Sequence, residues 1–158
     1  MSQYLFHFTI TPVQSFVAQA RRTRDLWAGS YMLSYLAGIA MKAITDSGGR
    51  IVFPAIDEDP LFKALQDSSK TKIDDDAARI GSLPNRFKAE AEDPAAAAHA
   101  AKTAVQEAWF KISEAVLAKV KEKAGSSFND QYTLDIWQRQ VCNHWEVSWI
   151  IGDDGALL

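Results

Sequence analysis

Hydrophobic and polar residues alternate near both ends of the chain. Over residues 4–10, aromatic and β-branched side chains recur at every second position, and this period of two is typical of a half-buried strand. Residues 145–151 alternate in the same way and predict the last strand. Trp145 and Trp149 share one face of it, which we expect to be buried. If no helix covered that face, it would mark a surface for a partner.

A helical period follows the first strand. Thr11 and Pro12 are typical of an N-cap and a first helical position, and apolar residues then recur with helical spacing as far as Ile44. Glycine weakens this stretch in its middle. We therefore expect one long helix with a kink, or two helices that meet at residues 28–30. The Ser-Gly-Gly run at residues 47–49 ends the helical stretch.

Two further strands are expected in the middle of the chain. Residues 50–53 form a short apolar run, and residues 82–89 are typical of a turn that enters a third strand. Between them, residues 57–81 are polar and predict a surface excursion with one short helix near residues 61–65.

The second half of the chain is mainly helical. Asp93 and Pro94 repeat the signal of an N-cap followed by proline, and an alanine-rich amphipathic stretch then predicts a helix that ends near Gly125. A shorter helix is expected over residues 133–143.

The predicted order is strand, helix, strand, strand, helix, strand. This order defines a ferredoxin-like α+β fold, in which an antiparallel sheet carries both helices on one face. The 158 residues fit a single domain, since domains hold about 150 residues. The second face of the sheet is free to meet another molecule.

Composition narrows the function classes. A formal net charge of -3 argues against a protein that coats nucleic acid, because non-specific phosphate binding needs an excess of basic residues. The single cysteine excludes an internal disulfide and a multi-cysteine zinc site. No apolar run approaches the length of a membrane span, and the first residues lack a signal-peptide pattern. We therefore expect a cytoplasmic protein.

Adjacent carboxylates near the end of the chain are one candidate site. Asp153 and Asp154 follow a glycine, and such a pair holds two metal ions in palm polymerases and cyclases. Those sites take a third carboxylate from the first strand, where this chain has Thr9 or Thr11. A solvated turn is therefore the preferred interpretation, and we predict no metal site.

The histidines and the cysteine do not form a recognisable metal or nucleophile motif. No spacing of the HxxxH or HExxH kind occurs, and nothing in the sequence places a base beside the cysteine. We expect structural roles for all four residues, which are His7, His99, His144 and Cys142.

Basic residues gather on the first predicted helix. Because a guanidinium fork suits phosphate oxygens, the cluster is a candidate contact for phosphate or RNA, with a solvated helix face as the alternative. Its members are Arg21, Arg22 and Arg24, and further cations on the predicted strands are Arg50, Arg86 and Lys88.

Three segments of the chain carry a resemblance to a known family. Residues 8–31 read FTITPVQSFVAQARRTRDLWAGSY, residues 48–54 read GGRIVFP, and residues 82–87 read SLPNRF. In this order they resemble the large subunit of type III-B, Cmr-type, CRISPR effector complexes. Residues 137–149 look like the next strand of that family, so the resemblance covers almost the whole chain.

The family carries two palm domains, and this chain resembles the first palm alone. The second palm holds a GGDD metal site and in many members makes cyclic oligoadenylates from ATP once target RNA is bound. The first palm completes the nucleotide pocket, so the resemblance implies ATP with Mg²⁺ as a ligand only when both palms are present. It places six residues at that pocket: Thr11, Pro12, Val13, Gln14, Ser15 and Ser30.

The resemblance also implies partners for the domain and a lack of catalytic activity when the domain is alone. We expect a fragment that is catalytically silent alone and that meets the second palm, other Cmr-type subunits, and guide and target RNA through the complex. Two alternatives stay open. One is a stand-alone nucleotidyl cyclase or polymerase palm that uses Asp153 and Asp154. The other is an RNA-binding ferredoxin-like module, although the RNP motif is absent.

Overall fold

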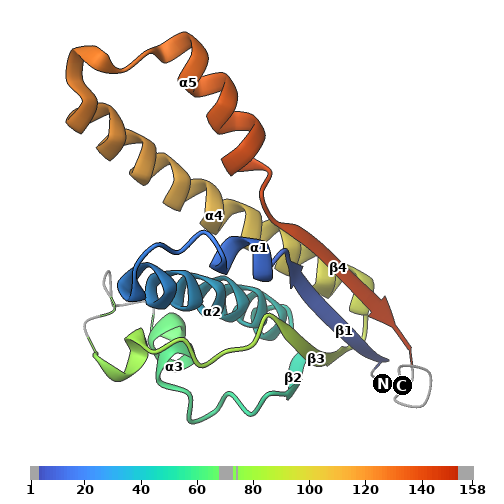
Figure 1. The fold of residues 1–158 in the computed structure, drawn as a ribbon. Helices are drawn as coiled ribbons and strands as arrows, with labels where there is room; N and C mark the ends of the chain where they lie inside the picture. The colour runs from blue at the N-terminus through green and yellow to red at the C-terminus, as the bar shows by residue number, and fades with distance from the viewer. Residues whose placement is uncertain (1–3, 68–72, 74, 153–158) are drawn as a thin grey trace.

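The computed structural model describes residues 4–67, 73 and 75–152. Four strands form one sheet in the order β2-β3-β1-β4, and every neighbouring pair is antiparallel (Figure 1). The predicted α+β class with an antiparallel sheet is confirmed. The strands are β1 (Tyr4–Thr11), β2 (Arg50–Phe53), β3 (Arg86–Ala91) and β4 (Glu146–Ile151).

The alternation in the sequence sorts the side chains of the sheet onto two faces. Phe6, Phe8 and Ile10 of the central strand β1 are fully buried, and the ring of Phe8 stacks on that of Phe87 at 5.0 Å between centroids. Trp149 lies opposite Phe8 in the β1–β4 register, so the apolar face of β4 belongs to the same core.

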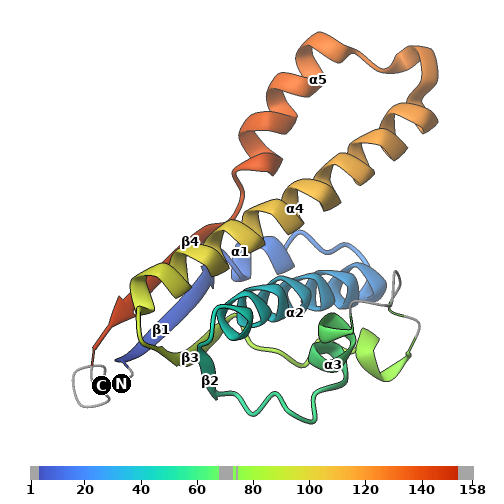
Figure 2. The same ribbon diagram turned by 180° about the vertical axis from the view of Figure 1, so that it is seen from behind.

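Two long helices cover this apolar face, α2 (Thr23–Asp46) and α4 (Pro94–Ala124), and they lie side by side in Figure 2. Asp93 caps α4 by accepting a hydrogen bond from the Ala96 N–H at 2.9 Å, as the sequence predicted. His99 of α4 contacts the Trp149 ring at 4.8 Å. The face that carries the two tryptophans is therefore a core face and not a partner surface.

The helical break lies earlier than residues 28–30, so that prediction was wrong. A short helix α1 (Gln14–Val17) is followed by five non-helical residues, and α2 then runs without interruption through Gly29. Gly29 packs against the ring of Phe16, and this tertiary contact outweighs the weak helix propensity of glycine. Thr11 does not cap a helix because it stays paired in the β1–β4 ladder.

Part of segment 57–81 belongs to the core. Helix α3 (Pro60–Gln66) begins after Asp59, whose side chain accepts from the Phe62 N–H at 2.8 Å. The short helix predicted near residues 61–65 is confirmed, but its residues Leu61 and Phe62 are buried, which the polar composition of the segment did not indicate. The expectation of a surface excursion therefore does not hold for α3.

The second half of α4 extends beyond the sheet and returns through α5 (Asp130–Trp137) and a π-helical turn, Gln138–Cys142 (Figure 1). We call residues 110–143 the helical arm. No residue of α5 or of the π-helical turn is buried. Among the described residues, no helix combines the length and the apolar composition that crossing a lipid bilayer requires.

Candidate functional site

The junction of β1 and α1 carries five of the six residues predicted at a nucleotide pocket. Thr11 ends β1, and its hydroxyl donates to the Glu146 carbonyl at 3.4 Å. Val13 is the N-cap residue of α1 and gives no side-chain hydrogen bond, so the first N–H groups of the helix receive no acceptor from it. Gln14 and Ser15 are exposed, and Pro12 and Val13 are partly buried.

Segment 81–85 links this junction to the sixth residue, Ser30. Asn85 pairs with Ile10, since the Ile10 N–H donates to the Asn85 carbonyl at 2.9 Å and the Asn85 amide donates back at 3.0 Å. A Cβ at Gly81 would come within 3.0 Å of the Ser30 carbonyl oxygen, so glycine allows the segment to touch α2. Segment 81–85 therefore runs from Ser30 to the end of β1.

A buried hydroxyl holds the same segment against α2. Ser34 is almost fully buried, and its hydroxyl donates to the Leu83 carbonyl at 2.8 Å. One turn of α2 separates it from the exposed Ser30. The backbone on which the predicted pocket residues lie is thus fixed by hydrogen bonds, while the side chains of Gln14, Ser15 and Ser30 are exposed.

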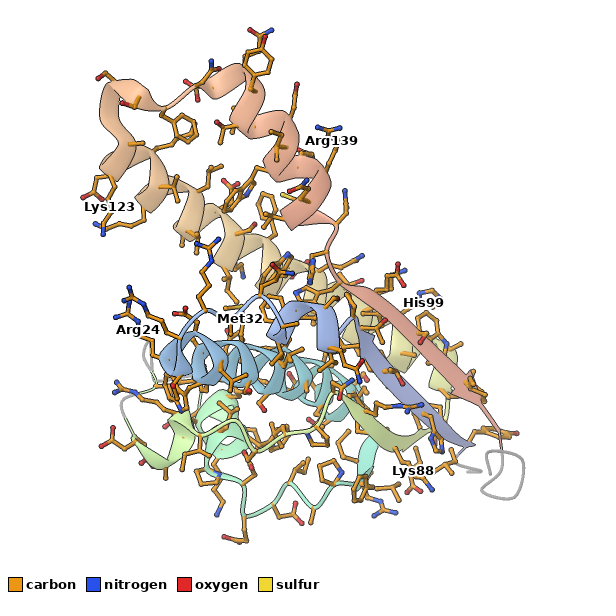
Figure 3. The ribbon with its side chains drawn as sticks, in the orientation of Figure 1. Arg24, Met32, Lys88, His99, Lys123 and Arg139 are labelled. Carbon is orange, nitrogen blue, oxygen red and sulfur yellow. The ribbon has the colours of Figure 1, made fainter. Side chains whose placement is uncertain are left out.

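The arginine cluster lies at the beginning of α2. Arg21, Arg22 and Arg24 are all exposed, and Arg22 is the N-cap residue. Arg24 meets Asp25 at only 3.8 Å, and Figure 3 shows its side chain at the end of the helix, away from the core. Cations at a helix N-terminus are electrostatically unfavourable, so the cluster does not stabilise α2 and remains available to an anion.

An aromatic stripe that was not predicted from the sequence follows the cluster on α2. The half-exposed Trp27 stacks on Tyr31 with centroids 5.9 Å apart and planes 10° apart. Burial raises the pKa of the Tyr31 hydroxyl, with Tyr35 adding to the rise and Arg79 opposing it. Aromatic residues at positions 27, 31 and 35 repeat every four residues, which is the signal that could have revealed this surface.

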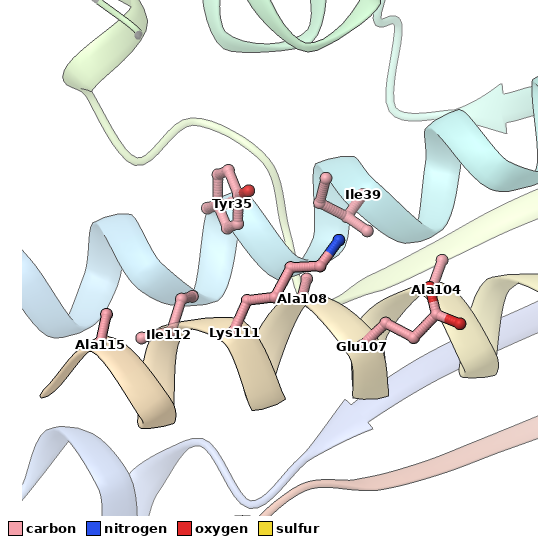
Figure 4. Close-up of a pocket in the computed structure, with 8 residues that line it drawn as sticks. All are labelled: Tyr35, Ile39, Ala104, Glu107, Ala108, Lys111, Ile112 and Ala115. Atoms are coloured by element: carbon pink, nitrogen blue, oxygen red, sulfur yellow. The ribbon is translucent and has the colours of Figure 1, made fainter. Parts of the chain in front are cut away.

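Two hollows adjoin the stripe between α2 and α4. The apolar one, of about 330 Å³, is lined by Trp27, Ala28, Tyr31, Met32, Tyr35 and Ile112. The other, of about 410 Å³, places Tyr35 and Ile39 of α2 across from Glu107 and Lys111 of α4 (Figure 4). Alanines of α4 leave room between the two helices there.

The histidines and the cysteine do not assemble into a site. His144 lies within an aromatic cluster with Phe16, Trp109 and Trp145, and its ring is 4.7 Å from that of Trp145. Burial lowers the pKa of His144. Among residues 4–67, 73 and 75–152, no group of three or more potential ligands could hold a metal ion. Asp153 and Asp154 lie outside the described residues.

The cations on the strands differ in their surroundings. Arg50 at the sheet edge donates to the Glu90 carboxylate at 2.9 Å, and this hydrogen bond raises the pKa of Arg50. Arg86 lies on the face of the sheet opposite to α2 and α4, where its side chain forms no ion pair or hydrogen bond with any residue that the structure describes. Lys88 shares that face.

The fold and these surfaces define a class of protein: an α+β domain whose four-stranded antiparallel sheet carries helices on one face and polar side chains on the other. The chain belongs to the family described as CRISPR-associated protein Cmr2, N-terminal, whose model matches residues 5–114. The resemblance to the Cmr large subunit is thereby confirmed.

A curated relative supports the same assignment. The CRISPR system Cmr subunit Cmr2 of Pyrococcus furiosus is 34% identical over 84 residues, which make up 52% of this chain. The match spans 9% of the length of that relative.

Proposed function

We propose that the chain is a ferredoxin-like palm domain that serves CRISPR-associated antiviral defence within a Cmr-type effector complex. The family match carries the proposal, and the sheet order β2-β3-β1-β4 supports it. In this order the chain leaves β1 for α2 and leaves β3 for α4, and both crossovers pack on the same face, as a split βαβ arrangement requires.

The domain contributes half of a nucleotide pocket and is catalytically silent alone. Thr11, Pro12, Val13, Gln14, Ser15 and Ser30 form this half, and ATP with Mg²⁺ binds once a second palm faces it. Two observations support the location. Segment 81–85 connects Ser30 to the end of β1, and the first N–H groups of α1 receive no acceptor from the N-cap side chain. The proposed catalytic silence has a separate support. A two-metal site needs a carboxylate on β1, and this chain has Thr9 and Thr11 at those positions.

The partners follow from the same proposal. The second palm, other Cmr-type subunits, and guide and target RNA surround the domain in the complex, in the cytoplasm. Arg21, Arg22 and Arg24 contact phosphate or RNA there. Their exposure and their electrostatically unfavourable position at the N-terminus of α2 support this role.

Calorimetry of ATP binding with Mg²⁺ tests the shared pocket. The 158-residue chain is compared with a longer protein that also carries the second palm. We expect the longer protein alone to bind ATP with an affinity that depends on Ser15 and Ser30, because the short chain supplies half of the contacts. Replacing Ser15 and Ser30 by alanine in the longer protein should weaken binding about a hundredfold, since two hydrogen bonds to a charged group are removed.

Ser127 provides a matched control, since it lies in the helical arm far along the chain from the proposed pocket. The variant Ser127→Ala should bind ATP as the unchanged protein does. Binding and turnover of ATP by the short chain would contradict the proposal of a silent half-site. Binding by the longer protein that survives the double substitution would remove Ser15 and Ser30 from the pocket.

A further inference from the structure

The uncovered face of the sheet carries a row of hydrogen-bond donors across three strands. Thr9 of β1 lies directly opposite Arg86 of β3 on one side and Ser148 of β4 on the other. Side chains of directly paired residues point to the same face with Cβ atoms about 5 Å apart. We call Arg86, Thr9 and Ser148 the donor row.

None of the three side chains has a partner within the described part of the chain. The side chains of Arg86, Thr9 and Ser148 form no hydrogen bond or ion pair with any described residue. The one carboxylate of β3, Glu90, is already bound by Arg50 at 2.9 Å. A guanidinium and two hydroxyl groups therefore lie on the same face of the sheet. The carboxylate of Glu90 does not neutralise the guanidinium, because it binds Arg50 instead.

A cavity lies over the row. It has a volume of about 250 Å³, and its lining includes Arg86, Thr9, Ser148, His7 and Ile150. The Nε2 atom of His7 is buried and has no hydrogen-bond partner among the described residues. An unsatisfied polar atom of this kind is destabilising unless a ligand or water supplies the missing hydrogen bond. The neighbouring row, Lys88–His7–Ile150, adds a second cation to the same face.

We propose that the donor row binds a phosphate group. A guanidinium fork matches the oxygens of phosphate, and the hydroxyl groups of Thr9 and Ser148 supply further donors. The phosphate could belong to a free nucleotide or to the backbone of single-stranded RNA, and the chemistry of recognition is the same. The inference does not depend on the proposed nucleotide pocket, because the two sites share no side chain.

The donor row itself offers no aromatic ring for the stacking of bases. RNA-binding sheets of this kind place aromatic rings at the centre of the open face, whereas the central positions here are occupied by His7, Thr9 and the donors beside them. Binding should therefore be governed by charge and should weaken as salt is added.

Binding of two probes by the 158-residue chain tests the inference: labelled oligouridylate, followed by fluorescence anisotropy, and ATP, followed by calorimetry. We expect Arg86→Gln to weaken binding about tenfold, as expected when a charge-assisted hydrogen bond is removed. For the RNA probe, the slope of log affinity against log salt should fall by about 0.7 for each phosphate that the protein no longer neutralises. Thr9→Val keeps the shape and strand propensity of the residue and should weaken binding several-fold.

Arg139→Gln is the matched control because it removes the same charge from the exposed helical arm (Figure 3). The donor row is supported if Arg86→Gln and Thr9→Val weaken probe binding while Arg139→Gln leaves it unchanged. The probe that responds, ATP or RNA, identifies the source of the phosphate. Equal weakening by Arg86→Gln and Arg139→Gln would show non-specific attraction and overturn the inference. Absence of binding to both probes would overturn it as well.

Discussion

The body of the domain and its helical arm are built by different means. In the body, Phe6, Phe8 and Ile10 are completely buried beneath α2 and α4. In the arm, the apolar residues Val116, Val120, Leu134 and Ile136 are each more than a third exposed. One helix, α4, passes through both regions, and its last buried residue is Leu117.

Charged side chains help to hold the tip of the arm. Lys121 binds Asp130 at 2.9 Å and lies 5.1 Å from the centre of the Phe128 ring, and Lys119 meets Glu122 at 2.7 Å. Exposed ion pairs of this kind contribute less than about 1 kcal/mol each. The comparison teaches that the stability of the domain resides in the body, and that the arm opens at a lower free energy than the sheet.

The largest effect should come from the body. Replacing Phe8 by alanine removes a fully buried ring that stacks on Phe87, and we expect a loss of about 3–5 kcal/mol in the free energy of unfolding. The matched change in the arm, Val120→Ala, should stay within about 0.5 kcal/mol because Val120 is 41% exposed. Urea unfolding measures the change in the free energy of unfolding for both variants. Equal losses would contradict the distinction between body and arm.

The same contrast explains what could be predicted from the sequence. In the body, every second residue of β1 from Phe6 to Ile10 is buried and Val147 and Trp149 of β4 are partly buried, so the alternation at residues 4–10 and 145–151 predicted both strands. Asp93 and Pro94 predicted where α4 begins, because capping of a helix depends only on neighbouring residues. The continuation of α2 through Gly29 could not be predicted, because Gly29 packs against Phe16 and no local pattern encodes that contact.

The candidate site was predicted less completely than the fold. The family segments pointed to the β1–α1 junction and to Ser30, but the link between them, segment 81–85, depends on long-range hydrogen bonds such as Asn85 to Ile10. The donor row needs the register of three strands before Arg86, Thr9 and Ser148 become neighbours. Registers of this kind follow from the assembled sheet and not from any one segment.

A smaller effect should mark the boundary between the two regions. Trp109 is buried, and its indole N–H donates to the Val141 carbonyl at 2.6 Å, joining α4 to the end of the arm. Trp109→Phe keeps an aromatic ring and removes this donor, so we expect a loss of about 1–2 kcal/mol in the free energy of unfolding. Hydrogen exchange should show faster exchange in residues 125–142 and unchanged exchange in β1.

Trp27→Phe is the control for that experiment. Trp27 is 52% exposed and lies on α2, so its substitution should leave exchange in the arm unchanged. Acceleration in β1 as large as that in the arm would show that body and arm unfold together, and the comparison would fail.

The smallest effect concerns protonation at the same boundary. Burial lowers the pKa of His144 from its ordinary value of 6.5, so the unfolded chain binds a proton at a higher pH than the folded one. The stability that this difference provides is fully present above the pKa of His144 in the unfolded chain. It is lost as the pH falls below that pKa toward the lower pKa of the folded chain. Thermal unfolding between about pH 7.5 and pH 5 should therefore show a steeper decline for the unchanged chain than for His144→Phe, which keeps aromatic contact with Phe16 and Trp145. Identical slopes would show that the boundary between body and arm is insensitive to the charge of His144.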